Sequence, residues 1–157
     1  MRIYLTGFMG AGKTTVGRML AQALQYDFYD LDQEIERDAG KQIPEIFHSG
    51  GEPGFRSIES AKLRALFPDN AVIATGGGCF IENSDWMIDN GIVIYLKVPF
   101  DLLVRRIGAD PNRPLWKNAA TLFQQREASY CKAQITVDGS LQPDRVVEEV
   151  LTAIGKN

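Results

Sequence analysis

The feature that most constrains this chain is a glycine-rich segment close to its N-terminus. Residues 7–15 read GFMGAGKTT and match the pattern G-x-x-x-x-G-K-[ST]. An apolar run at residues 3–5 precedes the segment, and apolar side chains recur at helical spacing from Val16 to Leu24. A strand, a glycine-rich turn and a helix N-terminus together direct free backbone N–H groups and the positive end of the helix dipole at one point. The segment therefore predicts a site for the phosphates of a nucleoside triphosphate.

Different residue types in this loop have different roles in phosphate binding. Its glycines allow the backbone to curve around a phosphate without clashes from Cβ atoms. We expect the ammonium group of Lys13 to reach the β- and γ-phosphates and the hydroxyl group of Thr14 to bind Mg²⁺. The residues expected to bind ATP here are Gly10, Ala11, Gly12, Lys13, Thr14 and Thr15. A turn that merely caps a helix is the alternative, and the flanking strand and helix argue against it.

The composition indicates one compact domain. The chain has 157 residues, 45% of them hydrophobic, which is enough for a proper core. A net charge of −3 argues against a general nucleic-acid-binding protein, which would carry a basic face. Cys79 and Cys131 lie far apart without a C-x-x-C pair, so they predict neither a disulfide scaffold nor a zinc site. No apolar run approaches the roughly 18 residues that span a bilayer. We also expect no leader before the first strand, and so we expect a cytoplasmic enzyme without membrane contact.

Strands and helices are expected to alternate along the chain. The strands are predicted at about residues 2–5, 26–30, 71–75, 92–96 and 134–137. The helices are predicted from residue 16 to about 25, from residue 35 onward, and at about 43–47, 52–67, 84–88, 100–107, 119–132 and 144–154. This alternation is typical of an α/β doubly wound parallel sheet, in which ligands bind beyond the carboxyl ends of the strands.

Two aspartates follow the second expected strand. Asp30 and Asp32 would both lie near the phosphate loop. One carboxylate can hold Mg²⁺ through water while the other accepts a proton from an attacking hydroxyl group. Alternatively, Asp30 only caps the following helix. The presence of both acids beside a phosphate loop favours the functional interpretation.

An arginine and a run of glycines suggest a second ligand. Arg56 is expected one turn into a helix, where its charge opposes the dipole, and a planar bidentate donor there suits a carboxylate. Glu59 could orient it, although an exposed helix ion pair is the simpler alternative. Gly76, Gly77 and Gly78 follow a buried strand and would allow a substrate to lie against bare backbone. An ordinary flexible loop would have the same composition.

Further arginines surround a polar segment at about residues 108–118. The glycine and prolines of that segment suggest a hinged lid, from which Arg113 could reach a phosphoryl group during its transfer. A solvated basic loop is the alternative. Arg126, in the next expected helix, could be a surface residue. His48, the only histidine, is expected at a helix C-terminus and receives no catalytic role.

The whole pattern resembles the shikimate kinase family, in the nucleoside-monophosphate-kinase-like group of P-loop proteins. The matching segments cover essentially the full length: residues 7–15, Asp30-x-Asp32, residues 51–59, Gly76–Gly78, Arg113-Pro114-Leu115, and Arg126 with Tyr130. The resemblance implies a three-layer α/β/α fold with a five-stranded parallel sheet in the order 2-3-1-4-5. It also implies transfer of the γ-phosphoryl group of ATP to the 3-hydroxyl group of shikimate, in the bacterial pathway to aromatic amino acids.

For the substrate, the resemblance implies a role for each matching residue. Asp32 would contact the substrate hydroxyl groups and act as the base, with Asp30 in the outer shell of Mg²⁺. Arg56 and Arg126 would hold the carboxylate group, and the N–H group of Gly77 would bind a ring hydroxyl. The substrate-binding helices would lie at about residues 31–60, and the protein would be a monomer.

For the nucleotide, the resemblance implies contacts from the lid and the C-terminal region. Arg113 would stabilise the transferred phosphate, and Arg106 would lie near adenine. Many members of the family place an arginine against adenine near the C-terminus, and here Gln142 is expected in its place. The segment between Arg113 and Arg126 looks short, so closure of the lid is expected to shield the site less fully.

Two other functions stay open from the sequence. A P-loop kinase for another small metabolite, such as gluconate or a nucleoside monophosphate, would share the phosphate loop. Two arginines for a carboxylate favour shikimate, whereas a nucleotide acceptor would need a pocket that reads its base. A non-catalytic nucleotide-binding switch would need no second substrate pocket.

Overall fold

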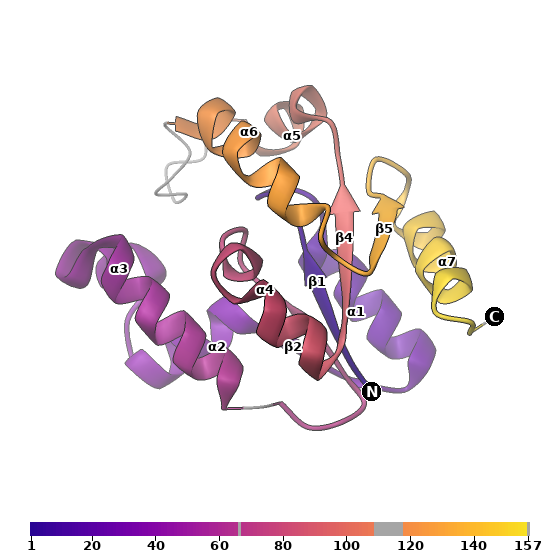
Figure 1. Ribbon diagram of the computed structural model, residues 1–157, viewed down its shortest axis with the longest axis horizontal. Coiled ribbons are helices and arrows are strands. Elements are labelled where there is room, and N and C mark those ends of the chain that lie inside the picture. The colour runs from indigo at the N-terminus through magenta and orange to yellow at the C-terminus, as the bar shows by residue number, and fades with distance from the viewer. Residues whose placement is uncertain (66, 109–117, 157) are drawn as a thin grey trace.

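The protein folds as a three-layer α/β/α sandwich (Figure 1). The computed structural model describes residues 1–65, 67–108 and 118–156. The strands in these ranges are β1 (Arg2–Thr6), β2 (Asp27–Asp30), β3 (Ala71–Ala74), β4 (Ile92–Lys97) and β5 (Ile135–Asp138). The helices there are α1 (Lys13–Leu24), α2 (Leu31–Ala39), α3 (Ile43–Arg64), α4 (Cys79–Asn90), α5 (Phe100–Ile107), α6 (Ala119–Tyr130) and α7 (Pro143–Ala153).

All strand pairs of the sheet are parallel, and the strand order is β2-β3-β1-β4-β5, which confirms the predicted fold. β1 lies at the centre, where Tyr4 is paired with Ile73 of β3 and with Val93 of β4. The interior of β1, β3 and β4 is almost fully buried. Helices on both faces of the sheet explain why these strands read as near-continuous apolar runs.

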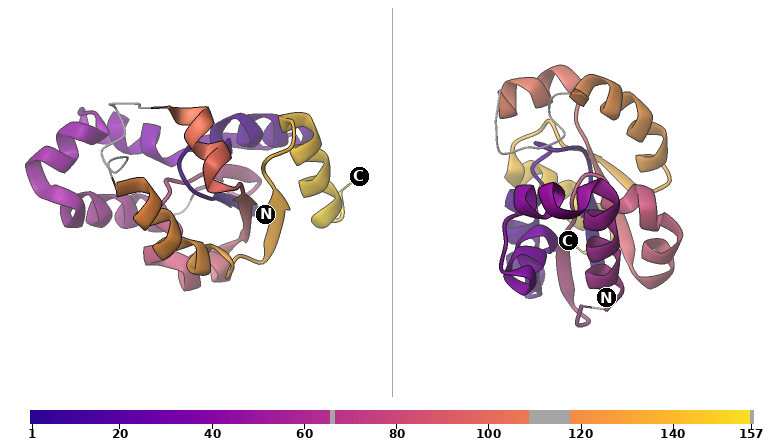
Figure 2. Two further views of the ribbon diagram at one scale, coloured as in Figure 1. Left: turned by 90° about the horizontal axis from the view of Figure 1, so that it is seen from above. Right: turned by 90° about the vertical axis from the view of Figure 1, so that its left-hand side faces the viewer.

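The helices lie on both faces of the sheet. α1 and α7 contact each other on one face, whereas α4 contacts β1, β4 and α6 on the other (Figure 1). α2 and α3 contact each other and lie at one end of the molecule, with α7 at the opposite end (Figure 2). None of the helices in the described ranges is long and apolar enough to cross a membrane.

The phosphate loop between β1 and α1 depends on glycine for conformation and for space. Gly10 and Gly12 have φ angles of 86° and 94°, in the left-handed region that side chains disfavour. A Cβ atom on Gly10 would also lie 2.7 Å from Cδ1 of Ile107 in α5. The glycine pattern of the motif therefore sets both the curve of the loop and its contact with α5.

α2 begins earlier than the sequence predicts. The apolar periodicity indicated a start near Ile35, but the helix starts at Leu31, directly after β2. Asp30 is the reason, because its Oδ1 accepts a hydrogen bond from the backbone N–H of Gln33 at 3.2 Å and caps the helix. Asp32 consequently lies in the first turn of α2, where a negative charge is favoured by the helix dipole.

α3 contains the predicted interruption but ends early. Its residues run from Ile43 to Arg64, with Gly51 in a non-helical conformation (φ 66°, ψ −172°), where the sequence predicted a break between two helices. The helix was predicted to continue to Phe67, which is wrong. Ile58, expected on the apolar side, is 41% exposed.

α4 starts at Cys79, whereas Ser84 was predicted as its N-cap. The observed cap is Gly78, which has no side chain to signal a helix start. Asn83 is kinked out of helical conformation (φ −129°, ψ 22°), so Ser84 begins only the second part of the helix. α1 starts at Lys13, three residues before the predicted start, whereas the predicted bounds of the strands and of α5, α6 and α7 agree with the structure to within two residues.

Candidate functional site

A cavity of about 920 Å³ opens at the carboxyl ends of β1, β2 and β3. With one exception, every predicted site residue that the structure describes lines it. These residues are Gly10, Ala11, Gly12, Lys13, Thr14, Thr15, Asp30, Asp32, Arg56, Glu59, Gly76, Gly77, Gly78, Arg106 and Arg126. Arg113 and most of the expected lid lie outside the described residues.

The exception, Gln142, lines a smaller cavity of about 350 Å³ on the other side of the phosphate loop. Arg106 borders both cavities and donates hydrogen bonds to the carbonyl oxygens of Gly10 (3.3 Å) and Gly139 (3.0 Å). It thereby connects the phosphate loop to the segment that carries Gln142. Asp138 stabilises the same segment by accepting hydrogen bonds from Ser140, which lower the pKa of Asp138.

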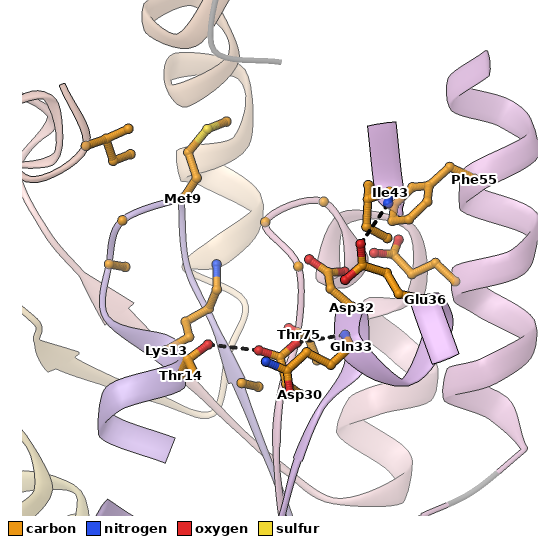
Figure 3. Close-up of a pocket in the computed structure, with 18 of the residues that line it drawn as sticks. Met9, Lys13, Thr14, Asp30, Asp32, Gln33, Glu36, Ile43, Phe55 and Thr75 are labelled. Atoms are coloured by element: carbon orange, nitrogen blue, oxygen red, sulfur yellow. Dashed lines mark hydrogen bonds between the residues drawn. The ribbon is translucent and has the colours of Figure 1, made fainter. Parts of the chain in front are cut away.

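The phosphate side of the large cavity places a cation opposite a carboxylate. The ammonium group of Lys13 donates to the carbonyl oxygens of Gly7 and Phe8 in the loop. Figure 3 shows this ammonium group and the carboxylate of Asp32 facing the same space. The hydroxyl group of Thr14 donates to Oδ2 of Asp30 at 3.0 Å. Asp30 therefore caps α2 with one oxygen and meets the phosphate loop with the other, so the two interpretations of this residue are compatible.

Asp32 is a half-buried acid with an unused acceptor. Its Oδ1 has no hydrogen-bond partner within the described part of the chain. Burial and the neighbouring charge of Asp30 raise the pKa of Asp32, while Lys13 and Arg56 oppose the rise. An acid with a raised pKa in a cavity is a candidate for proton transfer.

Arg56 and Glu59 form a buried ion pair. Nη1 of Arg56 donates to Oε1 of Glu59 at 2.8 Å, and Glu59 is wholly inaccessible to solvent. Burial raises the pKa of Glu59, and the charge of Arg56 opposes it. The alternative of an exposed helix ion pair is therefore wrong, and Glu59 holds the guanidinium group in place at the wall of the cavity.

The triple glycine makes room for the charged side chains of the site. A Cβ atom on Gly76 would lie 3.1 Å from Oε2 of Glu59 and 3.2 Å from Oδ1 of Asp32. A Cβ atom on Gly77 would lie 3.0 Å from Nη1 of Arg126. On Gly78, it would lie 2.6 Å from Cζ of Arg56. None of these glycines has a positive φ angle, so it is space and not conformation that requires them.

Comparisons with known proteins assign the chain to a family. A family model described as shikimate kinase matches residues 9–155. The chain belongs to the shikimate kinase family. A shikimate kinase of Aquifex aeolicus is 39% identical to this chain, in an alignment that covers 100% of this chain and 98% of the relative.

Solved structures agree with the family assignment. A shikimate kinase from Acinetobacter baumannii in complex with shikimate superimposes with a TM-score of 0.92 at 39% identity, covering 98% of this chain and 92% of the other. A gluconokinase from Sinorhizobium meliloti has a TM-score of 0.63 at 17% identity, covering 98% and 91%, which shows a shared fold alone.

The sequence did not predict several residues that line the large cavity. Glu36 lies one helical turn after Asp32, lines the cavity and accepts a hydrogen bond from the N–H group of Ile43 at 2.9 Å (Figure 3). Its Asp-x-x-x-Glu spacing could have revealed it. Phe47 and Phe55 stack with ring centroids 4.8 Å apart and form an apolar wall. No signal in the sequence distinguishes these aromatic side chains from core residues.

Proposed function

We propose that the large cavity holds the reacting ends of ATP and shikimate side by side, each bound by separate residues of the chain. The enzyme carries out the reaction of its family, in which the γ-phosphoryl group of ATP passes to the 3-hydroxyl group of shikimate and gives shikimate 3-phosphate and ADP. The observation that carries the proposal is the continuity of the cavity from the phosphate loop to two arginines beside a glycine turn. The chain would act as a single domain, in the cytoplasm and as a monomer.

In this proposal, Arg56 and Arg126 bind the carboxylate group of shikimate. Each charge-assisted hydrogen bond contributes about 1.5–3 kcal/mol, so two arginines supply much of the affinity for a small polar acid. Glu59 orients Arg56, and the N–H group of Gly77 donates to a ring hydroxyl. The glycine turn at residues 76–78 keeps these donors close together, because no side chain of its own separates them.

The nucleotide occupies the opposite end of the cavity in the proposal. The backbone from Gly10 to Thr15 and the ammonium group of Lys13 bind the phosphates. The smaller cavity, bordered by Arg106 and Gln142, receives adenine. Arg113 would approach the transferred phosphate from a lid at about residues 108–118.

The chemical step needs a base and charge stabilisation. A bond forms between the 3-oxygen of shikimate and the γ-phosphorus, while the bond from that phosphorus to the β,γ-bridging oxygen breaks. The proton of the 3-hydroxyl group passes to Asp32, whose raised pKa suits it as an acceptor. Lys13 and Arg113 stabilise the negative charge that spreads over the phosphoryl oxygens.

The site also fits Mg²⁺. Thr14 and Asp30 bring a hydroxyl and a carboxylate oxygen to within 3.0 Å of each other beside the phosphate loop, and Mg²⁺ prefers oxygen ligands. The described residues contain no cluster of three or more His, Cys, Asp or Glu placed to hold a metal, which agrees with an ion held mainly by phosphates and water. We propose that Thr14 ligates the ion and that Asp30 contacts it through water. When bound, Mg²⁺ supplies charge neutralisation on the phosphates.

A phosphorylation assay across shikimate, gluconate, CMP and AMP tests the proposal. We expect turnover with shikimate and little with the other acceptors. CMP and AMP have no carboxylate group for the two arginines and would need a pocket that reads a base. Gluconate has a carboxylate group, but its open chain does not place hydroxyl groups as the ring of shikimate does beside Asp32 and the N–H group of Gly77. Turnover with gluconate or a nucleotide in place of shikimate would contradict the proposal. ATP binding without any transfer would indicate a nucleotide-binding switch.

A further inference from the structure

The hydroxyl group of Tyr130 lies at the glycine turn of the acid-binding region. Tyr130 follows Arg126 by one turn of α6, and both side chains are buried. The hydroxyl group donates a hydrogen bond to the carbonyl oxygen of Gly77, which is 53 residues earlier in the chain. Arg126 lies beside it, because a Cβ atom on Gly77 would be 3.0 Å from Nη1 of Arg126 and 3.5 Å from the hydroxyl oxygen of Tyr130. The guanidinium group lowers the pKa of Tyr130 through its charge and through a hydrogen bond to the hydroxyl oxygen. One phenol thus connects a substrate-binding arginine to the glycine turn.

The direction of this chain of hydrogen bonds is fixed by protonation. Burial raises the pKa of Tyr130 to about 12, although Arg126 and Arg56 oppose the rise. The hydroxyl group therefore keeps its proton at neutral pH and can donate one hydrogen bond while it accepts another. Without it, the carbonyl group of Gly77 and an N–H group of Arg126 would each lose a partner in a buried place.

The effect extends to the second arginine through the peptide plane. The carbonyl group of Gly77 shares a planar peptide unit with the N–H group of Gly78. A hydrogen bond to that carbonyl oxygen therefore sets the orientation of Gly78 as well. The guanidinium group of Arg56 packs against Gly78, where a Cβ atom would lie 2.6 Å from Cζ. Tyr130 thus contacts Arg126 directly and supports the surface on which Arg56 rests.

We propose that Tyr130 is a positioning residue, whose hydroxyl group aligns Arg126 with the Gly77–Gly78 turn so that both arginines meet the carboxylate of shikimate in register. This inference rests on the proposed function, because it assumes that the arginines bind that carboxylate. The ring of Tyr130 has a separate packing role, since it stacks on Tyr95 with centroids 5.0 Å apart and an interplanar angle of 26°. Packing and positioning can therefore be tested independently.

The test removes only the hydroxyl group, in the variant Tyr130→Phe. Tyr95→Phe is the matched control, because Tyr95 is equally buried in β4 and does not line the cavity. We expect Tyr130→Phe to raise the KM and the Kd for shikimate about tenfold, as loss of a hydrogen bond to a charged group predicts. The KM for ATP should stay within about twofold, and Tyr95→Phe should leave both KM values unchanged. An unchanged KM for shikimate, or an equal rise for ATP, would overturn the inference.

A second readout separates positioning from general loosening of the fold. The neutral carboxamide of shikimate lacks the charge that the arginines recognise, so the wild type should prefer the acid in kcat/KM. In Tyr130→Phe this preference should fall about tenfold, and an unchanged preference would refute the proposal. If Tyr130→Phe does not fold, replacement of Tyr130 by 4-aminophenylalanine provides a hydrogen-bond donor in place of the hydroxyl group. This variant should keep the wild-type preference for the acid over the carboxamide, and loss of that preference would count against the inference. Failure of the wild type to use shikimate at all would instead refute the proposed function.

Discussion

Replacement of Arg56 by lysine tests most directly how the enzyme binds the carboxylate group of its substrate. Lysine keeps the positive charge beside the buried carboxylate of Glu59, which is wholly inaccessible and 2.8 Å from the guanidinium group. Alanine would leave that carboxylate unpaired, and breaking a buried pair costs about 3–5 kcal/mol of stability. Arg56→Lys therefore separates recognition of the substrate from folding.

The magnitude follows from the geometry of the guanidinium group. Nη1 of Arg56 is engaged by Glu59 and Nε is paired with Oε1 of Glu52 at 3.6 Å, which leaves Nη2 to meet a substrate carboxylate at the cavity wall. A lysine ammonium group that pairs with Glu59 cannot present a second planar edge to a carboxylate. Loss of one charge-assisted hydrogen bond of about 1.5–3 kcal/mol predicts a rise of about ten- to a hundredfold in the KM for shikimate.

Steady-state kinetics with each substrate varied in turn provides the assay. The KM for ATP should not change, and kcat should fall little if the contact is equally strong in the ground state and the transition state. Arg64→Lys is a suitable control, because Arg64 lies on the same helix, donates to Asn83 at 3.2 Å and does not line the cavity. A rise in the KM for ATP, with that for shikimate unchanged, would show that Arg56 is assigned to the wrong substrate.

Three further predictions concern the phosphoryl-transfer side of the site. Asp32→Asn should lower kcat about 10²–10⁴-fold while ATP still binds, and a normal kcat would exclude Asp32 as the base. The same variant should be more stable than the wild type at pH 7 in urea denaturation. The reason is that burial raises the pKa of folded Asp32, so the stability contributed by its protonated form is lost as the pH rises through that pKa. This advantage should vanish below about pH 4, near the ordinary pKa of aspartate. Lys13→Ala should abolish transfer and keep the circular dichroism spectrum, and an undiminished rate would contradict the phosphate-binding role of Lys13.

The sequence predicted the strands and most helix boundaries because these depend on local patterns, whereas the strand order was implied only by the family resemblance. The errors occur where the local signal is weak or misleading. Gly78 caps α4 without a side chain, and Asn83 interrupts the helix just before Ser84, which made the later residue look like the start. α2 was placed too late because its cap, Asp30, belongs to the preceding strand.

The membership of the candidate site was predictable in part, but the burial of its side chains was not. Residue types at strand ends and in glycine-rich turns, together with the family resemblance, identified just over half of the described residues that line the cavity, and they missed Glu36, Phe47 and Phe55. The pair of Arg56 and Glu59 was expected from its spacing, but its burial was not predictable. Glu59 could have been an exposed partner of Arg56, and it is buried where its carboxylate meets the turn after β3, with Oε2 3.1 Å from where a Cβ atom on Gly76 would lie.

By itself, the sequence determined where a phosphate could bind, since the curve of the loop at residues 7–15 is a property of neighbouring residues and of glycine conformation. Tertiary structure decided how the acid-binding side chains are held. Gly77 and Tyr130 are 53 residues apart and meet only because the fold brings the turn after β3 against the end of α6. No local pattern encodes such a contact, because its geometry depends on the order of the strands and on the helices that cover them.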